Sequence, residues 1–273
     1  MAADVYEYQA GLSNWARAMG DLRQGFERRR LWTDMAVRAF NNKYRGAGFG
    51  ALWLTFTVAM TATGLGLLYG KLFGLPLQEH LPYVTSALIA WSLITGLATG
   101  GCDVFVGNAH AFKEFPLPTS LFAYRLVLTQ TILAAYRLIV LLGVIVIFSV
   151  PLGLQVMLSV LGFALLLWIG FWSSLTLGVI NARYRDFGQL VSAFFTFAFF
   201  LTPIFWLPER LGDYAYLVNF NPFYHMIEVI RGPIIGGADL GLHFLVVVLV
   251  ALAAPPVGIY VYGRLSHRLP YWC

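Results

Sequence analysis

The longest uncharged stretch of the chain runs from Leu138 to Ala182, 45 residues without an Asp, Glu, Lys, Arg or His. Only the turn-forming sequence Pro151-Leu152-Gly153 interrupts its apolar pattern. An α-helix rises ~1.5 Å per residue, and about 20 apolar residues are needed to cross a bilayer hydrocarbon core ~30 Å thick. The stretch is long enough for two crossings, so it predicts a membrane-spanning helical hairpin.

The other uncharged runs place four more crossings along the chain. Together with the hairpin, the predicted spans are Phe49 to Tyr69, Leu81 to Gly101, Phe122 to Val150, Leu152 to Ile180, Gly188 to Leu207, and Leu242 to Tyr262. We therefore expect an all-α integral membrane protein with six transmembrane helices. Its transmembrane domain would cover residues 48–263, between an N-terminal segment, 1–47, and a tail, 264–273.

The basic residues predict the orientation of these spans. An even number of spans places both termini on one side of the membrane. If that side also holds the loops 102–121 and 181–187, it collects 14 of the 18 Lys and Arg residues, counting Arg125 at the start of the third span. The opposite side holds Lys71, Arg210 and Arg231, and Arg137 lies inside a span. Because cytoplasmic loops are enriched in Lys and Arg, we expect both termini to be cytoplasmic.

A helix with two distinct faces is predicted before the first span. Apolar residues recur there at helical spacing, and polar residues fill the opposite face. The apolar face consists of Trp32, Met35, Ala36, Ala39 and Phe40, and the polar face of Arg28, Asp34, Arg38, Asn41 and Arg45. This pattern is typical of a helix that lies in the membrane interface. The alternative is a solvated helix that packs on a soluble partner. The two interpretations are compatible if a partner docks on the helix at the membrane interface.

The segment from Leu207 to Gly241, between the last two spans, has a pattern of its own. Asn221-Pro222 predicts a helix start, with Asn as N-cap and Pro at the first helical position, and Gly232-Pro233 predicts its end. We expect these residues to form re-entrant helices that dip into the outer leaflet. Re-entrant backbone is tolerated only where protein or a water-filled cavity covers it, so the segment is a candidate gate or pore lining. Its candidate residues are Asn221, Tyr224, His225, Glu228 and Arg231.

The composition argues against an enzyme that hydrolyses ATP by itself. The chain is 59% hydrophobic and 11% charged, and its glycine-rich run from Gly64 to Lys71 departs from the phosphate-loop spacing, with Leu72 in place of the hydroxyl residue. The predicted spans contain no Asp or Glu, which secondary transporters often use for ion coupling. If the chain drives transport, we expect the energy to come from another subunit. We expect no metal, no cofactor and no nucleic-acid partner for this chain.

Five short motifs, in this order and spacing, resemble the ABC-2 type permease subunits of bacterial polysaccharide exporters. The likeness is greatest to O-antigen (lipopolysaccharide) permeases, with capsule and teichoic acid permeases next. The motifs are Lys43-Tyr44-Arg45-Gly46 running into Leu52-Trp53, Phe115-Pro116-Leu117-Pro118, Asn181-Ala182-Arg183-Tyr184-Arg185-Asp186, Thr202-Pro203-Ile204-Phe205-Trp206, and Asn221-Pro222-Phe223-Tyr224-His225 with Arg231.

The resemblance implies a homodimer bound to two copies of a separate ATPase, which would supply the ATP and Mg²⁺ sites. The complex would move lipid-linked polysaccharide across the bacterial inner membrane, from cytoplasm to periplasm. It also implies a coupling helix, predicted over Asp103 to Lys113 and ending near Phe115, that docks on the ATPase. The residues expected to make this contact are Phe112, Lys113, Glu114, Phe115 and Pro116, together with Arg183, Arg185 and Asp186 of the loop after the fourth span.

Further candidates for the channel lie within the spans. Arg137 would be costly in lipid, so it should face the bundle or the pore, either paired with a backbone carbonyl or in contact with an anionic substrate. The aromatic candidates are interfacial anchors or surfaces on which sugar rings stack. They are Trp91 in the second span and, in the fifth span, Phe195, Phe199 and Trp206, together with Phe197 and Phe200. Two rival functions are export of a small hydrophobic compound and a membrane-embedded transferase. The transferase would need Asp, Glu or His converging at one membrane face, a pattern that the sequence lacks.

Overall fold

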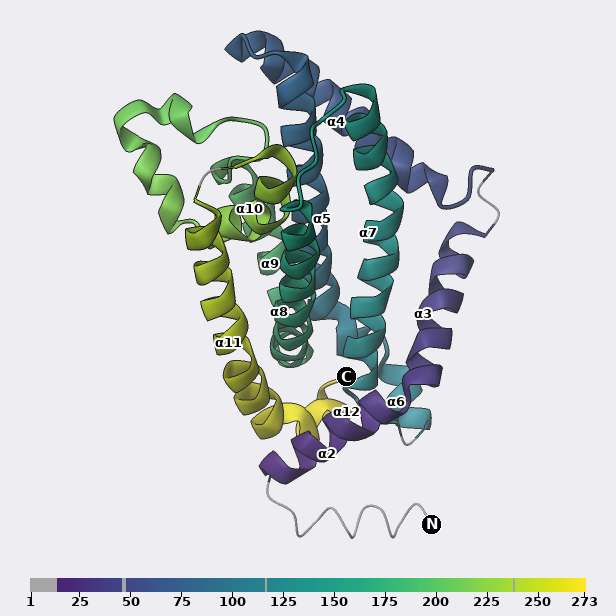
Figure 1. Ribbon diagram of the computed structural model, residues 1–273. Helices are drawn as coiled ribbons and strands as arrows, with labels where there is room; N and C mark the ends of the chain where they lie inside the picture. The colour runs from purple at the N-terminus through teal and green to yellow at the C-terminus, as the bar shows by residue number, and fades with distance from the viewer. Residues whose placement is uncertain (1–13, 46–47, 116, 238) are drawn as a thin grey trace.

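The computed structural model describes residues 14–45, 48–115, 117–237 and 239–273, and every regular element in these ranges is helical. Figure 1 shows their arrangement. The elements are α2 (Asn14–Glu27), α3 (Arg29–Tyr44), α4 (Leu52–Phe73), α5 (Leu77–Val106), α6 (Ala109–Glu114), α7 (Leu121–Ile147), α8 (Val156–Arg183), α9 (Phe187–Leu201), η1 (Pro208–Phe220), α10 (Pro222–Ile235), α11 (Leu240–Leu265), η2 (Ser266–Arg268) and α12 (Leu269–Trp272).

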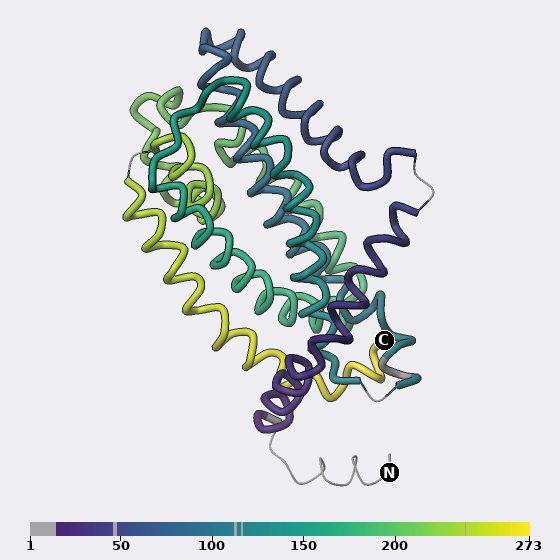
Figure 2. Tube along the Cα trace, turned by 45° about the vertical axis from the view of Figure 1, so that its right-hand side comes forward, coloured from purple at the N-terminus to yellow at the C-terminus, as the bar shows by residue number. Residues whose placement is uncertain are grey.

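The centre of the bundle is α5, which packs against α4, α7, α8, α9 and α10. Of the most apolar part of α5, 83% lies inside the protein, compared with 11% for α4. The helices α11 and α3 flank the bundle on opposite sides (Figures 1 and 2). This is the all-α membrane architecture that the uncharged runs predicted.

Helices α5 and α8 can approach each other closely because small residues line their contact. A Cβ atom added at Gly101 would lie 2.8 Å from the Cα of Ser174, and one added at Gly178 would lie 2.5 Å from Val104. A larger residue at either position would force the neighbouring atoms to shift, so glycine permits this close approach. Small residues of this kind drive helix association in membranes through close backbone packing.

The number of spans differs from the sequence-based expectation. Within the described residues, five helices are long and apolar enough to cross a membrane: α4, α5, α7, α8, and α11 continuing to Trp272. The fifth predicted span, Gly188 to Leu207, forms only the 15-residue α9, which is about 22 Å long at ~1.5 Å per residue. The helix ends at Leu201 because Pro203 disfavours helical backbone at Thr202, which is extended (φ −96°, ψ 135°).

The two ends of the bundle carry different elements. The short helices α2, α6 and α12 gather at one end, together with the turn between α8 and α9 (Figure 1). The other end holds η1, α10 and the connections α4–α5 and α7–α8 (Figure 1). We call these the α2 end and the η1 end. Of the segments that the charge pattern assigned to one side of the membrane, α2, α6, the turn between α8 and α9 and α12 lie at the α2 end, whereas α3 rises from that end along α7 (Figure 1).

Candidate functional site

The α2 end presents the helix that was predicted to contact an ATPase, but in a shorter form. The α5 helix continues through Val106, and the separate helix α6 begins only at Ala109, after the turn at Gly107-Asn108. It ends at Glu114, as expected from the prolines that follow, and the Phe115 side chain is 59% exposed. Pro116 and the side chains of Phe112 and Lys113 lie outside the described residues.

The loop between α8 and α9 lies at the same end and is held by Asn181. The Asn181 side chain donates to the Cys102 carbonyl oxygen (2.9 Å) and accepts from the Gly188 amide (2.7 Å), so it closes the turn against the end of α5. This leaves Arg183, Arg185 and Asp186 exposed.

The two arginines of this loop also hold α12 in place. The Arg185 Nη2 donates to the Trp272 carbonyl oxygen (3.0 Å), and the Arg183 guanidinium lies 5.6 Å from the Trp272 ring centroid. Because α12 contacts α6 as well as α8, it connects both predicted docking segments. The exposed residues of α6, of the loop 183–186 and of α12 thus form one surface, which we call the α2-end platform.

A carboxylate that the sequence analysis did not select fixes α2 to this end. Asp21 accepts hydrogen bonds from the backbone amides of Thr119 (2.8 Å) and Ser120 (2.9 Å), just before α7. It also accepts one from the Tyr262 hydroxyl of α11 (2.5 Å). Three segments from distant parts of the sequence therefore meet at one side chain, which satisfies amides at a helix start that need acceptors.

The predicted interface helix, α3, packs along α7. Trp32 and Phe40 stack on Tyr124 and Tyr136, with ring centroids 5.9 and 5.2 Å apart. The two tyrosines are 12 residues apart, roughly 18 Å along a helix, so α3 climbs beside α7 instead of lying across its end (Figure 1). The contacts of Trp32 with Tyr124 and of Phe40 with Tyr136 hold α3 along this course.

The two predicted faces of α3 are largely as expected. Ala36 and Phe40 are buried, and Met35 is partly buried, whereas Arg38 is exposed on the other face. Ala39, which was placed on the apolar face, is exposed.

Arg137 lies at this contact between α3 and α7. Its side chain is half-buried, and its Nη1 has no hydrogen-bond partner among the described residues. Its guanidinium interacts electrostatically with the phenol of Tyr44, at the end of α3. Burial raises the pKa of the Tyr44 phenol, and the Arg137 guanidinium partly offsets this rise. Arg137 therefore faces protein, as expected, but its partner is α3.

At the η1 end, two of the predicted gate residues, Glu228 and Arg231, form a buried polar cluster with Tyr83. The guanidinium of Arg231, which is fully buried, pairs with the Glu228 carboxylate and donates from Nη1 to the Pro203 carbonyl oxygen (2.8 Å). It lies 3.7 Å from the ring centroid of Tyr83, whose hydroxyl is 3.0 Å from the Trp206 carbonyl oxygen. A buried charge is costly unless it is paired in this way. The cluster therefore fixes α10 to α5 and to the segment after α9.

The other predicted gate residues extend this cluster. The Asn221 side chain caps α10 by accepting from the Phe223 amide (2.9 Å), as predicted, and donates to the Thr202 hydroxyl (3.0 Å). The His225 and His243 Nδ1 atoms are 2.8 Å apart, and the His225 Nε2 is 2.8 Å from the Asn219 carbonyl oxygen. Since a carbonyl only accepts, His225 carries its proton on Nε2, and His243 donates between the two rings.

The Tyr224 ring packs edge-on against His243, with ring centroids 5.1 Å apart. The end of α10 differs from the expectation. The helix continues through Pro233 to Ile235, where Gly236 in the left-handed region (φ 80°) ends it.

The aromatic candidates of the fifth predicted span divide into two groups. Phe195 and Phe199 turn inward and pack on Trp91, with ring centroids 5.8 and 5.9 Å from it. Phe197 and Phe200 point outward, 64% and 62% exposed. Trp91 thus lies in the core of the chain and not at an interface.

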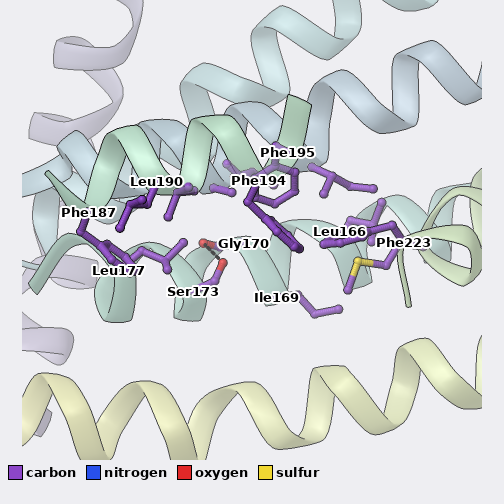
Figure 3. A pocket seen from close by; sticks show the side chains of 15 residues that line it. Leu166, Ile169, Gly170, Ser173, Leu177, Phe187, Leu190, Phe194, Phe195 and Phe223 are labelled. Carbon is purple, nitrogen blue, oxygen red and sulfur yellow. Dashed lines mark hydrogen bonds between the residues drawn. The ribbon is translucent and has the colours of Figure 1, made fainter. Parts of the chain in front are cut away.

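An apolar cavity of about 450 Å³ lies between α5, α8, α9 and α10. Figure 3 shows side chains of α9 facing α8 across it, with Phe194 and Phe195 directed towards Gly170 and Leu166. Ser173 is the one polar residue among those that line it within the described chain. The cavity therefore suits an apolar group and not a sugar.

Comparison with known proteins identifies the family. The sequence profile described as ABC-2 type transporter matches residues 31–235, more than half of the chain. The chain belongs to the ABC-2 type transporter family. No curated protein sequence matches it. The matched residues run from α3 to the end of α10 and include α6, the loop 183–186 and the polar cluster at the η1 end.

Membership of the ABC-2 type transporter family explains the main features of the chain. It is a multi-pass membrane protein and a transport subunit, not itself catalytic, and permeases of this family typically work with an ATPase partner. The α2-end platform carries exposed charged residues, and the exposed aromatic side chain of Phe115 directly follows α6.

Proposed function

We propose that this ABC-2 permease is the transmembrane subunit of an ATP-driven exporter of lipid-linked polysaccharide, similar to O-antigen. Two copies would form the channel, and two copies of a separate ATPase would bind ATP and Mg²⁺ and dock on the α2-end platform. The α2 end would face the cytoplasm of a bacterial cell, and the η1 end the periplasm. The family match carries the transport function, and the order of the five motifs supports the substrate.

The outer face of α9 supports a polymer as the substrate. Phe197 and Phe200 are exposed there, each more than half, next to Leu201. Sugar rings have apolar C–H faces that stack on aromatic side chains, which suits a channel that passes a repeating polymer. If α9 of two copies faced a common channel, these rings would line it.

The test is reconstitution of the chain with the ATPase encoded next to it in its genome. We expect the pair, in sealed inverted vesicles with ATP, to move a lipid-linked polysaccharide into the lumen, where an added glycosidase no longer reaches it. The chain alone should neither bind ATP saturably nor transport. If the pair hydrolyses ATP but every tested lipid-linked polymer stays accessible to the glycosidase, the proposed substrate is wrong. The assignment of the chain as a transport subunit would still stand.

A second candidate function is export of a small hydrophobic compound, and the apolar cavity favours it. At about 450 Å³, it falls within the range of ~300–1,000 Å³ that is usual for small-molecule sites. Accumulation of a membrane-permeant fluorescent dye in the same vesicles distinguishes the two functions. Dye transport without polymer transport would establish the small-compound function.

A further inference from the structure

A second cavity lies at the η1 end, outside the polar cluster described above. Its volume is about 460 Å³. It is formed by the α4–α5 connection and the start of α5, by the α7–α8 connection, by Leu207 before η1 and by Ile235 at the end of α10. The residues that line it include Gln78, Glu79, His80, Tyr83, Phe148 and Pro151.

His80 is the unusual residue of this cavity. Its side chain is only 2% exposed, and neither ring nitrogen has a hydrogen-bond partner in the part of the chain that the structure describes. A buried polar group without a partner is costly, and such groups are uncommon in folded proteins. A partner supplied by a bound molecule would remove this cost, because a neutral imidazole both donates and accepts.

The other lining residues restrict the chemistry of that molecule. Gln78 and Glu79 are exposed at the rim and offer amide and carboxylate groups, whereas Phe148, Val150 and Pro151 provide an apolar wall. No Lys or Arg is among the lining residues identified in the described chain, and the Glu79 carboxylate repels anions. An anionic phosphate or lipid headgroup therefore fits poorly. A neutral molecule with many hydroxyl groups and an apolar face fits well.

We propose that this cavity is a binding site for neutral carbohydrate at the η1 end, with His80 at its base and Gln78 and Glu79 at its rim. Two sources supply this chemistry: a free sugar, or a sugar unit of a polymer that leaves the transporter. The site is argued from its own residues, and only the second source rests on the proposed function.

The cavity also adjoins the polar cluster. Leu207 and Ile235 line it at the two ends of the segment that contains η1 and α10. Tyr83 lines it too, and its hydroxyl lies 3.2 and 3.0 Å from the carbonyl oxygens of Pro203 and Trp206. A bound sugar would therefore contact the same segment that the Arg231–Glu228 pair holds.

The experiment measures sugar binding to the full chain in lipid nanodiscs by saturation-transfer NMR, with maltose and sucrose as neutral probes and glycerol 3-phosphate as the anionic probe. We expect binding of at least one disaccharide and none of glycerol 3-phosphate. His80→Leu, which keeps the volume and removes both nitrogens, should weaken binding at least tenfold. Glu79→Ala, at an exposed position, should weaken it several-fold without affecting the fold.

The matched controls are Gln155→Ala, at an exposed position at the same end but outside the cavity, and His110→Leu, an exposed histidine at the α2 end. Both should bind sugar as the unmodified chain does. Equal sugar binding by His80→Leu and Glu79→Ala, or binding of glycerol 3-phosphate alone, would overturn the proposal. If His80→Leu does not fold, unchanged binding by Glu79→Ala and Gln78→Ala is enough to overturn it.

A further comparison identifies the source of the sugar. Fragments of the surface polysaccharide that the host cell makes, freed from their lipid, are tested against maltose. Tighter binding of the fragments indicates the exported polymer, and equal binding indicates a free sugar. Failure of polymer export with sugar binding intact would contradict the proposed function and leave the site in place.

Discussion

Asp21 and Tyr262 lie 241 residues apart in the chain, yet the Tyr262 hydroxyl donates a hydrogen bond of 2.5 Å to the Asp21 carboxylate. The same carboxylate accepts from the two amides that precede α7. The segment between α6 and α7 is therefore tied to α2 and α11. If α6 is moved by an ATPase, as we propose, the movement reaches three helices together.

Replacing Asp21 by Ala should destabilise the protein by about 2 kcal/mol, because it leaves two amides and a hydroxyl without their acceptor. The thermal unfolding midpoint of the full chain in detergent measures this. Tyr262→Phe removes one of the three hydrogen bonds and should have a smaller effect. The control is Arg23→Ala, which breaks an exposed pair with Glu27 and should change stability by less than about 0.5 kcal/mol. Equal midpoints for Asp21→Ala and Arg23→Ala would show that the carboxylate does not hold α2.

Replacing Arg231 by Met should destabilise the chain by about 3–5 kcal/mol, since the Glu228 carboxylate would stay buried without its partner. The double replacement of Arg231 by Met and Glu228 by Gln should recover much of this loss, because no charge is left in the cluster. The folded yield after mild heating of the purified variants compares them. If the double variant is no more stable than Arg231→Met, the unpaired Glu228 charge is not the cause of the lost stability.

Phe115→Ala should leave the fold intact, because the side chain is exposed, but should weaken binding of the partner ATPase. Aromatic anchors often contribute about 2 kcal/mol or more, which corresponds to roughly 30-fold in affinity. Co-purification with the ATPase and export in cells are the measurements. Glu114→Gln changes an exposed charge beside it and should be mild. Normal co-purification and export by Phe115→Ala would show that α6 is not the coupling helix.

The close contact between α5 and α8 predicts that replacement by alanine has different effects on stability at two glycine positions. Gly178→Ala places a Cβ atom 2.5 Å from Val104, and overpacking of this kind typically costs about 1–3 kcal/mol. Gly64→Ala places one in open space and should leave the unfolding midpoint unchanged or slightly raised. A midpoint for Gly178→Ala that matches that of Gly64→Ala would indicate that α5 and α8 are further apart than described.

The orientation in the membrane can be measured with single cysteines placed in a chain whose Cys102 and Cys273 have been replaced. We expect a membrane-impermeant thiol reagent added outside the cell to label Asp213→Cys and not Asp34→Cys, because of the charge bias between the two sides. If Asp213→Cys is labelled only after the membrane is permeabilised, the orientation is the opposite one. That result would contradict the proposed placement of the ATPase.

Much of this fold could be predicted from the sequence because lipid imposes length and polarity rules on each span separately. The hairpin around Pro151 and the N-cap at Asn221 depend on local residues, and both are confirmed. Where a helix stops depends on more than local signals. Gly232-Pro233 carries a strong stop signal, yet α10 continues to Ile235: the helix packs against α8 and α11, its last turn is buried, and Gly236 caps it.

Residues that act through distant partners could not be identified from the sequence. Asp21 lies on a short amphipathic helix, and nothing near it in the chain indicates that its partners are Thr119, Ser120 and Tyr262. His80 at the start of a span looks like an ordinary interfacial residue. Only the folded chain shows that it is buried without a partner.

The limited burial of α4 has a consequence for how this region tolerates sequence change. Only Ala62, Gly66 and Gly70 are buried in it, spaced by four residues on one side of the helix. An added Cβ at Gly66 would lie 2.5 Å from Leu81 of α5, so this line of small residues is constrained by packing. Most of the remaining positions are exposed and need only be apolar, whereas Thr55, Val58, Leu65 and Tyr69 are partly buried against the bundle. In a saturation mutagenesis experiment, the exposed apolar positions of α4 should therefore accept almost any exchange among Leu, Ile, Val, Met and Phe, whereas along the line of small residues size, and not hydrophobicity, is under selection.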